Sequence, residues 1–80
     1  MSRNNKECQI FGDSIRRLRT ASGITQEELA DRSGIDRSYI GGVERGDRNP
    51  TLMVIAKIAA GLGVPISTLF LYGQHTESEK

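Results

Sequence analysis

The hydrophobic positions of this chain recur at helical spacing, and glycines separate one periodic segment from the next. In residues 8–22, one helical face collects Phe11, Ile15, Leu18 and Ser22. Gly23 follows as a stop signal. Before Gly63, a second apolar stripe is made by Leu52, Ile55, Ala56, Ala59 and Leu62. No segment shows the period of two that is typical of strands, so the pattern predicts an all-α chain.

The second predicted helix has a well-defined start. Thr25 is a good N-cap, and Glu28 three residues later completes a capping box. Ile24 before the cap and Leu29 at the fourth helical position form a hydrophobic staple. The helix is expected to end near residue 33, because Gly34 follows.

The third predicted helix repeats the same start signals. Asp36 is its N-cap, Ile35 and Ile40 can form its staple, and residue 45 is its expected end. The turn of residues 33–36 is short and contains glycine. Two short helices joined in this way fit a helix-turn-helix.

Two further helices are expected in the second half of the chain. The fourth begins either at Thr51 or at Pro50 with Asn49 as its cap, and Gly63 ends it. A brief fifth helix covers about residues 65–72, and a polar tail follows. We therefore predict a single domain over residues 1–80 with an ordered core of about residues 8–72.

The composition limits the class of protein. Eighty residues form one small domain, without room for a separate effector-binding domain. The net charge of +1 argues weakly, by itself, against a nucleic-acid partner. Nothing resembles a signal peptide or a membrane span, and the single cysteine, Cys8, cannot form an internal disulfide. We expect a cytoplasmic protein that does not enter the membrane.

Few side chains are suited to catalysis or metal binding. The only histidine, His75, lies in the predicted tail, without a cysteine or carboxylate partner at ligand spacing. The chain lacks a glycine-rich phosphate motif, and Ser38 has no apparent base to activate it. We therefore predict that the protein is not an enzyme and has no metal and no cofactor.

The first turn of the third helix carries side chains that suit DNA. Arg37 can bond to guanine through two hydrogen bonds, and the hydroxyl of Ser38 can contact bases or phosphate. Tyr39, on the flank, can pack its ring and offer its hydroxyl to a phosphate or base. The alternative is that these polar residues simply face solvent, as they do at the start of many helices.

Further DNA contacts are expected around this helix. Gly41 lies on its outward face and would allow close approach, whereas Gly42 serves either that purpose or local packing. Gln26 opens the second helix, where free backbone N–H groups favour a phosphate. Arg45 and Arg48 are candidate phosphate or groove contacts, although Arg45 could instead only stabilise the helix dipole.

Arg19 and Glu44 lie at the borders of inward helical faces rather than outside them. A partly buried arginine can pair with a carboxylate through two hydrogen bonds. We predict that this pair is a structural link between the first and third helices and that neither residue contacts a base.

The fifth helix has more apolar side chains than a short helix can bury within its own domain. A surplus of this kind is typical of an interface, so we predict a symmetric dimer. Its interface residues are Leu62, Ile66, Leu69, Phe70, Leu71 and Tyr72. The alternative is that Ile66 and Leu69 complete the core of the monomer while the others stay half exposed.

The run TQEELADRSGIDRSYIGGVERGDRNPTLMVIAKIAAGLGVPISTLF resembles the phage-repressor-like, XRE-type helix-turn-helix domains. The resemblance covers about residues 11–70, on markers that include GITQEELA, the run IGGVERG, PTL and LGV. Within that family the chain is most similar to the controller proteins of restriction–modification systems. The resemblance implies a compact five-helix, lambda-repressor-like DNA-binding domain that binds DNA as a dimer.

The resemblance also implies a mode of action. Such controllers bind operators upstream of their own gene and the endonuclease gene, activating at low occupancy and repressing at high occupancy. The positions that match the family's DNA contacts are Gln26, Arg37, Ser38, Tyr39, Arg45 and Arg48. Arg19 and Glu44 match the family's structural salt bridge.

We therefore predict a sequence-specific, homodimeric transcription regulator that binds double-stranded DNA at a near-palindromic operator, with RNA polymerase as a further candidate partner. A phage-type repressor or an antitoxin-like regulator is the alternative within DNA binding. A protein-interaction module that keeps this fold but binds no DNA is the alternative from another class.

Overall fold

The computed structural model describes the backbone of residues 6–77 and the side chains of residues 6–71. Five α-helices and no strand occur between residues 6 and 77, so the predicted all-α fold class is confirmed. The helices are α1 (Lys6–Ala21), α2 (Gln26–Ser33), α3 (Arg37–Arg45), α4 (Leu52–Leu62) and α5 (Ile66–Glu77). None of them is both long enough and apolar enough to span a bilayer.

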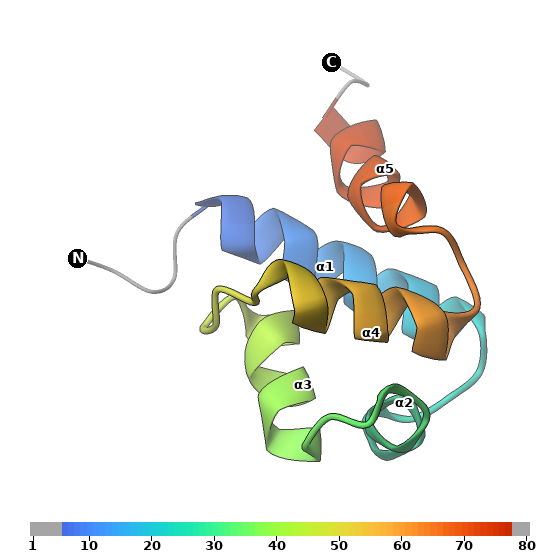
Figure 1. Ribbon diagram of the computed structural model, residues 1–80. Helices are drawn as coiled ribbons and strands as arrows, with labels where there is room; N and C mark the ends of the chain where they lie inside the picture. Colours follow the sequence, from blue (N-terminus) through green and yellow to red (C-terminus); the bar gives the residue numbers. More distant parts are fainter. Residues whose placement is uncertain (1–5, 78–80) are drawn as a thin grey trace.

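The helices place the helix-turn-helix and α5 at different ends of the molecule (Figure 1). Helices α1 and α4 occupy its middle. Helix α3 packs against α1 and α2, and α2 also packs against α4. Helix α5 packs against α1 and α4 on the other side, away from α2. One end of the domain is therefore available to a partner that contacts α2 and α3, and the other end to a partner that contacts α5.

Local capping bonds fix the starts of α2 and α3. The Glu28 backbone N–H donates to Thr25 Oγ1 at 3.0 Å, and the Thr25 N–H donates to Glu28 Oε1 at 2.8 Å. These two bonds complete the predicted capping box. The Ser38 N–H donates to the carboxylate of Asp36 at 2.9 Å, which makes Asp36 the N-cap of α3. The turn between these helices runs through Gly34 in the left-handed conformation, with φ of 70°.

The core joins apolar side chains from all five helices, and α1 contributes three large ones, Phe11, Ile15 and Leu18. Its most deeply buried members are Ile15, Leu29, Ile40, Ile58 and Leu69. The stripe predicted for α4 is wrong in part, because Leu52 is 73% exposed while Ile58, outside that stripe, is completely buried. Almost every residue of α4 is apolar, so its pattern alone cannot choose the buried face.

The helix ends also differ from the prediction at several places. Helix α1 begins at Lys6 and ends at Ala21, so Ser22 lies beyond it and is exposed. Thr51 is the N-cap of α4 rather than its first residue. Helix α5 continues to Glu77, past the expected end at residue 72. The single glycine at position 73 disfavours a helix only modestly, and no proline follows it to stop the helix.

Two glycines allow helices to cross at close range. A Cβ on Gly12 of α1 would overlap the carbonyl oxygen of Val43 and lie 2.8 Å from that of Glu44. A Cβ on Gly61 of α4 would overlap Ser33 Oγ on α2. A glycine within a helix weakens it by itself, so the role of Gly61 in the α2–α4 contact depends on the tertiary structure. Both crossings help to hold the helix-turn-helix against α1 and α4.

Candidate nucleic-acid interface

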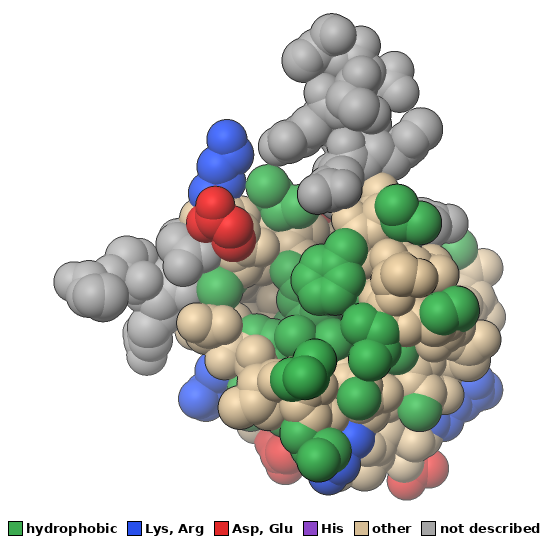
Figure 2. Space-filling view, turned by 45° about the horizontal axis from the view of Figure 1, so that its top comes forward, with side chains coloured by type: hydrophobic (Ala, Val, Ile, Leu, Met, Phe, Trp, Pro, Cys, Tyr) green, Lys and Arg blue, Asp and Glu red, His purple; other side chains and the backbone are tan. Residues whose placement is uncertain are grey.

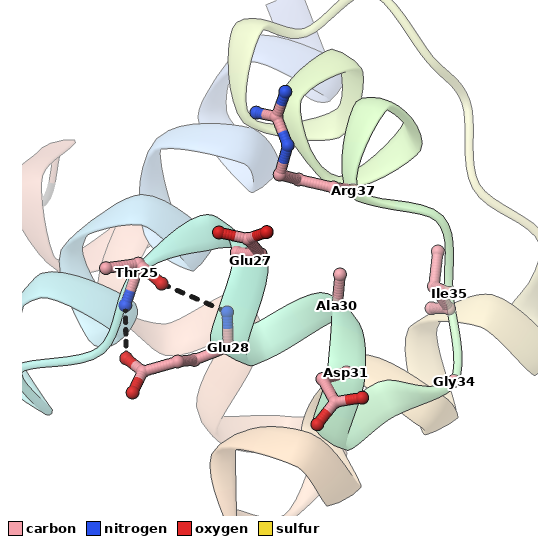
Figure 3. Close-up of a pocket in the computed structure, with 8 residues that line it drawn as sticks. All are labelled: Thr25, Glu27, Glu28, Ala30, Asp31, Gly34, Ile35 and Arg37. Carbon is pink, nitrogen blue, oxygen red and sulfur yellow. Dashed lines mark hydrogen bonds between the residues drawn. The ribbon is translucent and has the colours of Figure 1, made fainter.

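The first turns of α2 and α3 lie beside each other across an open depression (Figure 3). Arg37, at the start of α3, lines it together with three acidic side chains of α2, Glu27, Glu28 and Asp31. Glu28 is held by the capping box, as the dashed lines in Figure 3 show. Because carboxylates outnumber the guanidinium here, this depression does not suit a phosphate.

Arg37 and Ser38 are both exposed at the start of α3, where they were predicted. The Ser38 hydroxyl donates a hydrogen bond to Asp36, so in the free protein it faces its own N-cap. Hydrogen bonds from the Ser38 hydroxyl and N–H lower the pKa of Asp36, because they stabilise its charged form. Arg37 forms no ion pair within the described residues, so its guanidinium is available to a partner.

Tyr39 and Arg48 lie together, one on α3 and the other on the loop that follows it. The Arg48 guanidinium carbon lies 5.2 Å from the centre of the Tyr39 ring, within the range of a cation–π contact. Arg48 is exposed, Tyr39 is half-buried, and Arg48 forms no ion pair with any other described residue. The two predicted contact residues therefore form one unit.

Gly41, which was predicted to lie on the outward face of α3 and to allow close approach, is buried in the free protein. A Cβ at this position would lie 3.3 Å from Arg45 Nη1 and 3.6 Å from Gln26 Oε1. These two long side chains cover Gly41, one from the next turn of α3 and one from α2. The sequence could not show this cover, because the contact with Gln26 depends on how α2 packs against α3.

Gln26 and Arg45 each have a partner that the pattern of the sequence did not predict. Gln26 Nε2 donates to Glu44 Oε1 at 2.9 Å, which orients its amide on the first residue of α2. Arg45 Nε lies 2.9 Å from Asp47 Oδ2 in an exposed ion pair. The nearby carboxylate offsets the charge of Arg45, whereas Arg37 and Arg48 form no ion pair among the described residues.

Arg19 and Glu44 form the predicted structural ion pair. Arg19 Nε lies 2.6 Å from Glu44 Oε2, and Nη2 lies 3.0 Å from Oε1. Only 13% of the Arg19 side chain and 3% of the Glu44 side chain is exposed. The hydrogen bond to Glu44 raises the pKa of Arg19 above its ordinary value. Since Glu44 also accepts from Gln26, this one carboxylate ties α1, α2 and α3 together.

The remaining arginines of α1 do not add to this surface. Arg17 Nε donates to Asp13 Oδ2 at 2.7 Å, and Arg16 binds the other oxygen of the same carboxylate. Burial opposes the charge of Asp13, but the hydrogen bonds from Arg17 and Arg16 outweigh it and lower the pKa of this group. Both arginines are therefore partly neutralised on their own helix.

A second surface of the molecule is apolar. Figure 2 shows hydrophobic side chains gathered on the face that α4 and α5 form, where Ile66, Phe70 and Leu71 are exposed. Phe70 also packs on Phe11 of α1, with 5.1 Å between the ring centres.

The six predicted interface residues differ in how far they are exposed. Leu69 is wrong as an interface residue, because it is completely buried in the core of the monomer. Leu62 is half-buried and packs against that core. Ile66, Phe70 and Leu71 are exposed, and Tyr72 lies outside the residues whose side chains are described. The part of α5 that remains open to a partner is therefore centred on Phe70 and Leu71.

The sequence of this chain is also similar to those of known helix-turn-helix proteins. The family model described as "Helix-turn-helix" matches residues 15–69. The control protein C.MunI of a Mycoplasma species is 39% identical over 61 residues, covering 75% of this chain and 82% of that protein. The control protein C.BamHI of Bacillus amyloliquefaciens is 43% identical over 56 residues, covering 69% of each chain.

Solved structures of controller proteins are similar to this chain in both fold and sequence. The restriction–modification controller protein C.AhdI from Aeromonas hydrophila is 52% identical, with a TM-score of 0.79 over 80% of this chain and 97% of that one. Wild-type controller C.Esp1396I is 33% identical, with a TM-score of 0.82 over 91% and 95% of the two chains. The protein therefore belongs to the helix-turn-helix family of DNA-binding transcription regulators.

Proposed function

We propose that this regulator controls the genes of a restriction–modification system from an operator upstream of its own gene and the endonuclease gene. The observation that carries the proposal is the extent of the likeness to a controller protein. The 52% identity with C.AhdI spans 97% of that chain, so it is not confined to the helix-turn-helix that many regulators share. A regulator of this kind acts where the DNA is, in the cytoplasm, and activation would require contact with RNA polymerase.

The proposed complex is a homodimer that inserts one α3 helix into the major groove of each half-site. In this complex Arg37 reads a base edge, and the Tyr39–Arg48 unit contacts the flanking groove or backbone. The exposure of Arg37 and the contact between Tyr39 and Arg48 support these roles. Gln26 and Arg45 supply phosphate contacts. Two half-sites on a near-palindrome would then lie about 34–36 Å apart, or a multiple of that distance.

The direct test is a titration with the DNA upstream of this gene and with a random duplex, at low and moderate salt. We expect the upstream DNA to bind about 10³-fold tighter or more. Affinity should fall steeply with salt, because each phosphate that the protein neutralises releases counterions. Equal affinity for both duplexes would contradict the controller proposal. Failure to bind any duplex at either salt would contradict DNA binding itself and favour a protein-interaction module.

Arg37 should contribute to sequence choice rather than to general affinity. Arg37→Ala is expected to weaken binding to the operator by about 1–3 kcal/mol and to relax the preference at one base pair in each half-site. Competition binding against single-base operator variants measures both effects. Arg32→Ala, which removes an exposed arginine near the end of α2 outside the predicted interface, should change neither. If Arg37→Ala weakens every sequence equally, Arg37 binds phosphate and does not read a base.

A further inference from the structure

Gly42 is a glycine in the interior of α3, where alanine would stabilise the helix better. A Cβ at this position would lie 2.8 Å from Arg48 Cγ and 3.4 Å from Arg48 Nε. The third nearest atom, Arg48 Cδ at 3.7 Å, belongs to the same side chain. The aliphatic part of Arg48 therefore lies directly over the place where any other residue 42 would have its side chain.

The end of α3 brings Arg48 back to this position. Gly46 adopts the left-handed conformation, with φ of 83°, and its N–H donates to the carbonyl oxygen of Val43 at 3.0 Å. The N–H of Asp47 donates to the carbonyl oxygen of Gly42 at 2.9 Å. These two bonds form a Schellman motif, which turns the chain back along the helix. Arg48 is the next residue, so its side chain starts close to Gly42.

Gly42 and Tyr39 are three residues apart in α3 and therefore lie on neighbouring positions of one helical face. The stem of Arg48 crosses Gly42, and its guanidinium ends over the Tyr39 ring, 5.2 Å from the ring centre. The missing side chain of Gly42 thus leaves a slot that the stem of Arg48 occupies on its way to the tyrosine ring.

We infer that Gly42 is a positioning residue that presents Arg48 and Tyr39 to DNA as one preformed pair of contacts. This inference rests on the proposed role of α3 as the DNA-reading helix. A flexible arginine loses rotamer freedom when it binds, and holding it in place beforehand lowers that cost. Because the pair combines a ring, a hydroxyl and a guanidinium, its position relative to the groove contributes to sequence choice.

Gly42 differs in kind from the packing glycine of α1. At Gly12, the three atoms nearest to an added Cβ belong to the backbone of residues 43 and 44, so a substitution there would push two helices apart. At Gly42, all three belong to one exposed and flexible side chain. Gly42→Ala should therefore displace Arg48 and leave the helix packing intact.

The first part of the test uses the free protein. Arg48 side-chain protons that lie over an aromatic ring should have NMR shifts displaced by its ring current. Gly42→Ala should move these shifts toward random-coil values, as should Tyr39→Leu. The melting temperature of Gly42→Ala should equal or exceed that of the parent, because alanine favours the helix. Unchanged Arg48 shifts, or a lower melting temperature, would contradict the inference that Gly42 makes room for the stem of Arg48.

The second part is a double-mutant cycle on operator affinity, which separates a contact made through Arg48 from any other effect. Gly42→Ala is expected to weaken binding about tenfold, equal to about 1.4 kcal/mol. In the Arg48→Ala background the same change should have no further effect. An equal loss in both backgrounds, or no loss in the parent background, would overturn the inference alone. A parent protein that binds no duplex would overturn the proposed function instead.

Discussion

Replacing Glu44 with alanine is expected to lower the free energy of unfolding by about 3–5 kcal/mol. The change leaves the guanidinium of Arg19 without its carboxylate at a site where only 13% of the arginine side chain is exposed. An uncompensated buried charge is costly, and Gln26 loses its acceptor as well. Native domains are stable by only about 5–15 kcal/mol, so this loss is a large part of the total.

Urea unfolding followed by circular dichroism measures this loss, and two variants serve as controls. Asp47→Ala removes the carboxylate of the exposed pair with Arg45 and should cost no more than about 1 kcal/mol. The double variant Arg19→Met with Glu44→Leu removes both charges and should recover much of the stability. If Glu44→Ala costs as little as Asp47→Ala, the ion pair is not a structural link.

Leu71→Asp is expected to convert the proposed dimer into a monomer and to weaken operator binding by about 10²-fold or more. The binding loss follows because two linked reading helices gain about 10²–10⁴ over one. Leu71 is 60% exposed on α5, so the new charge should not disturb the fold of the monomer. Phe70 is a less suitable probe, because it packs on Phe11 within the same chain.

Sedimentation gives the oligomeric state of this variant, and a melting curve confirms that it remains folded. Leu52→Asp is the matched control, since Leu52 is also an exposed leucine but lies at the start of α4, outside the predicted interface. This variant should remain a dimer. A dimeric Leu71→Asp, or a monomeric Leu52→Asp, would show that the interface has been placed on the wrong surface.

The residues predicted to contact DNA show where sequence reasoning succeeds and where it stops. The exposure of Arg37 could be predicted, because it follows from an N-cap and the first turn of a helix. The cover over Gly41 could not, since it is made partly by Gln26 on another helix. The partner of Arg45 could not be predicted either, because Asp47 reaches it only after the turn that Gly46 makes.

The sequence by itself determined the start of α2 and of α3 and therefore the helix-turn-helix. Capping bonds join residues that are two or three positions apart, so Thr25 with Glu28 and Asp36 with Ser38 specify them locally. The side chains that α3 carries in its first turn follow directly from that start.

Only the tertiary structure decided which faces of α4 and α5 are buried. Both helices are rich in apolar residues, so their patterns allow more than one orientation. Leu69 belongs to the core because α5 packs against α1 and α4. Its carbonyl oxygen also accepts a hydrogen bond from the buried hydroxyl of Ser14, 55 positions earlier in the chain. Gly42 acquires its role in the same way, through the return of Arg48 along α3. Such contacts depend on how separate elements pack, which no local pattern specifies.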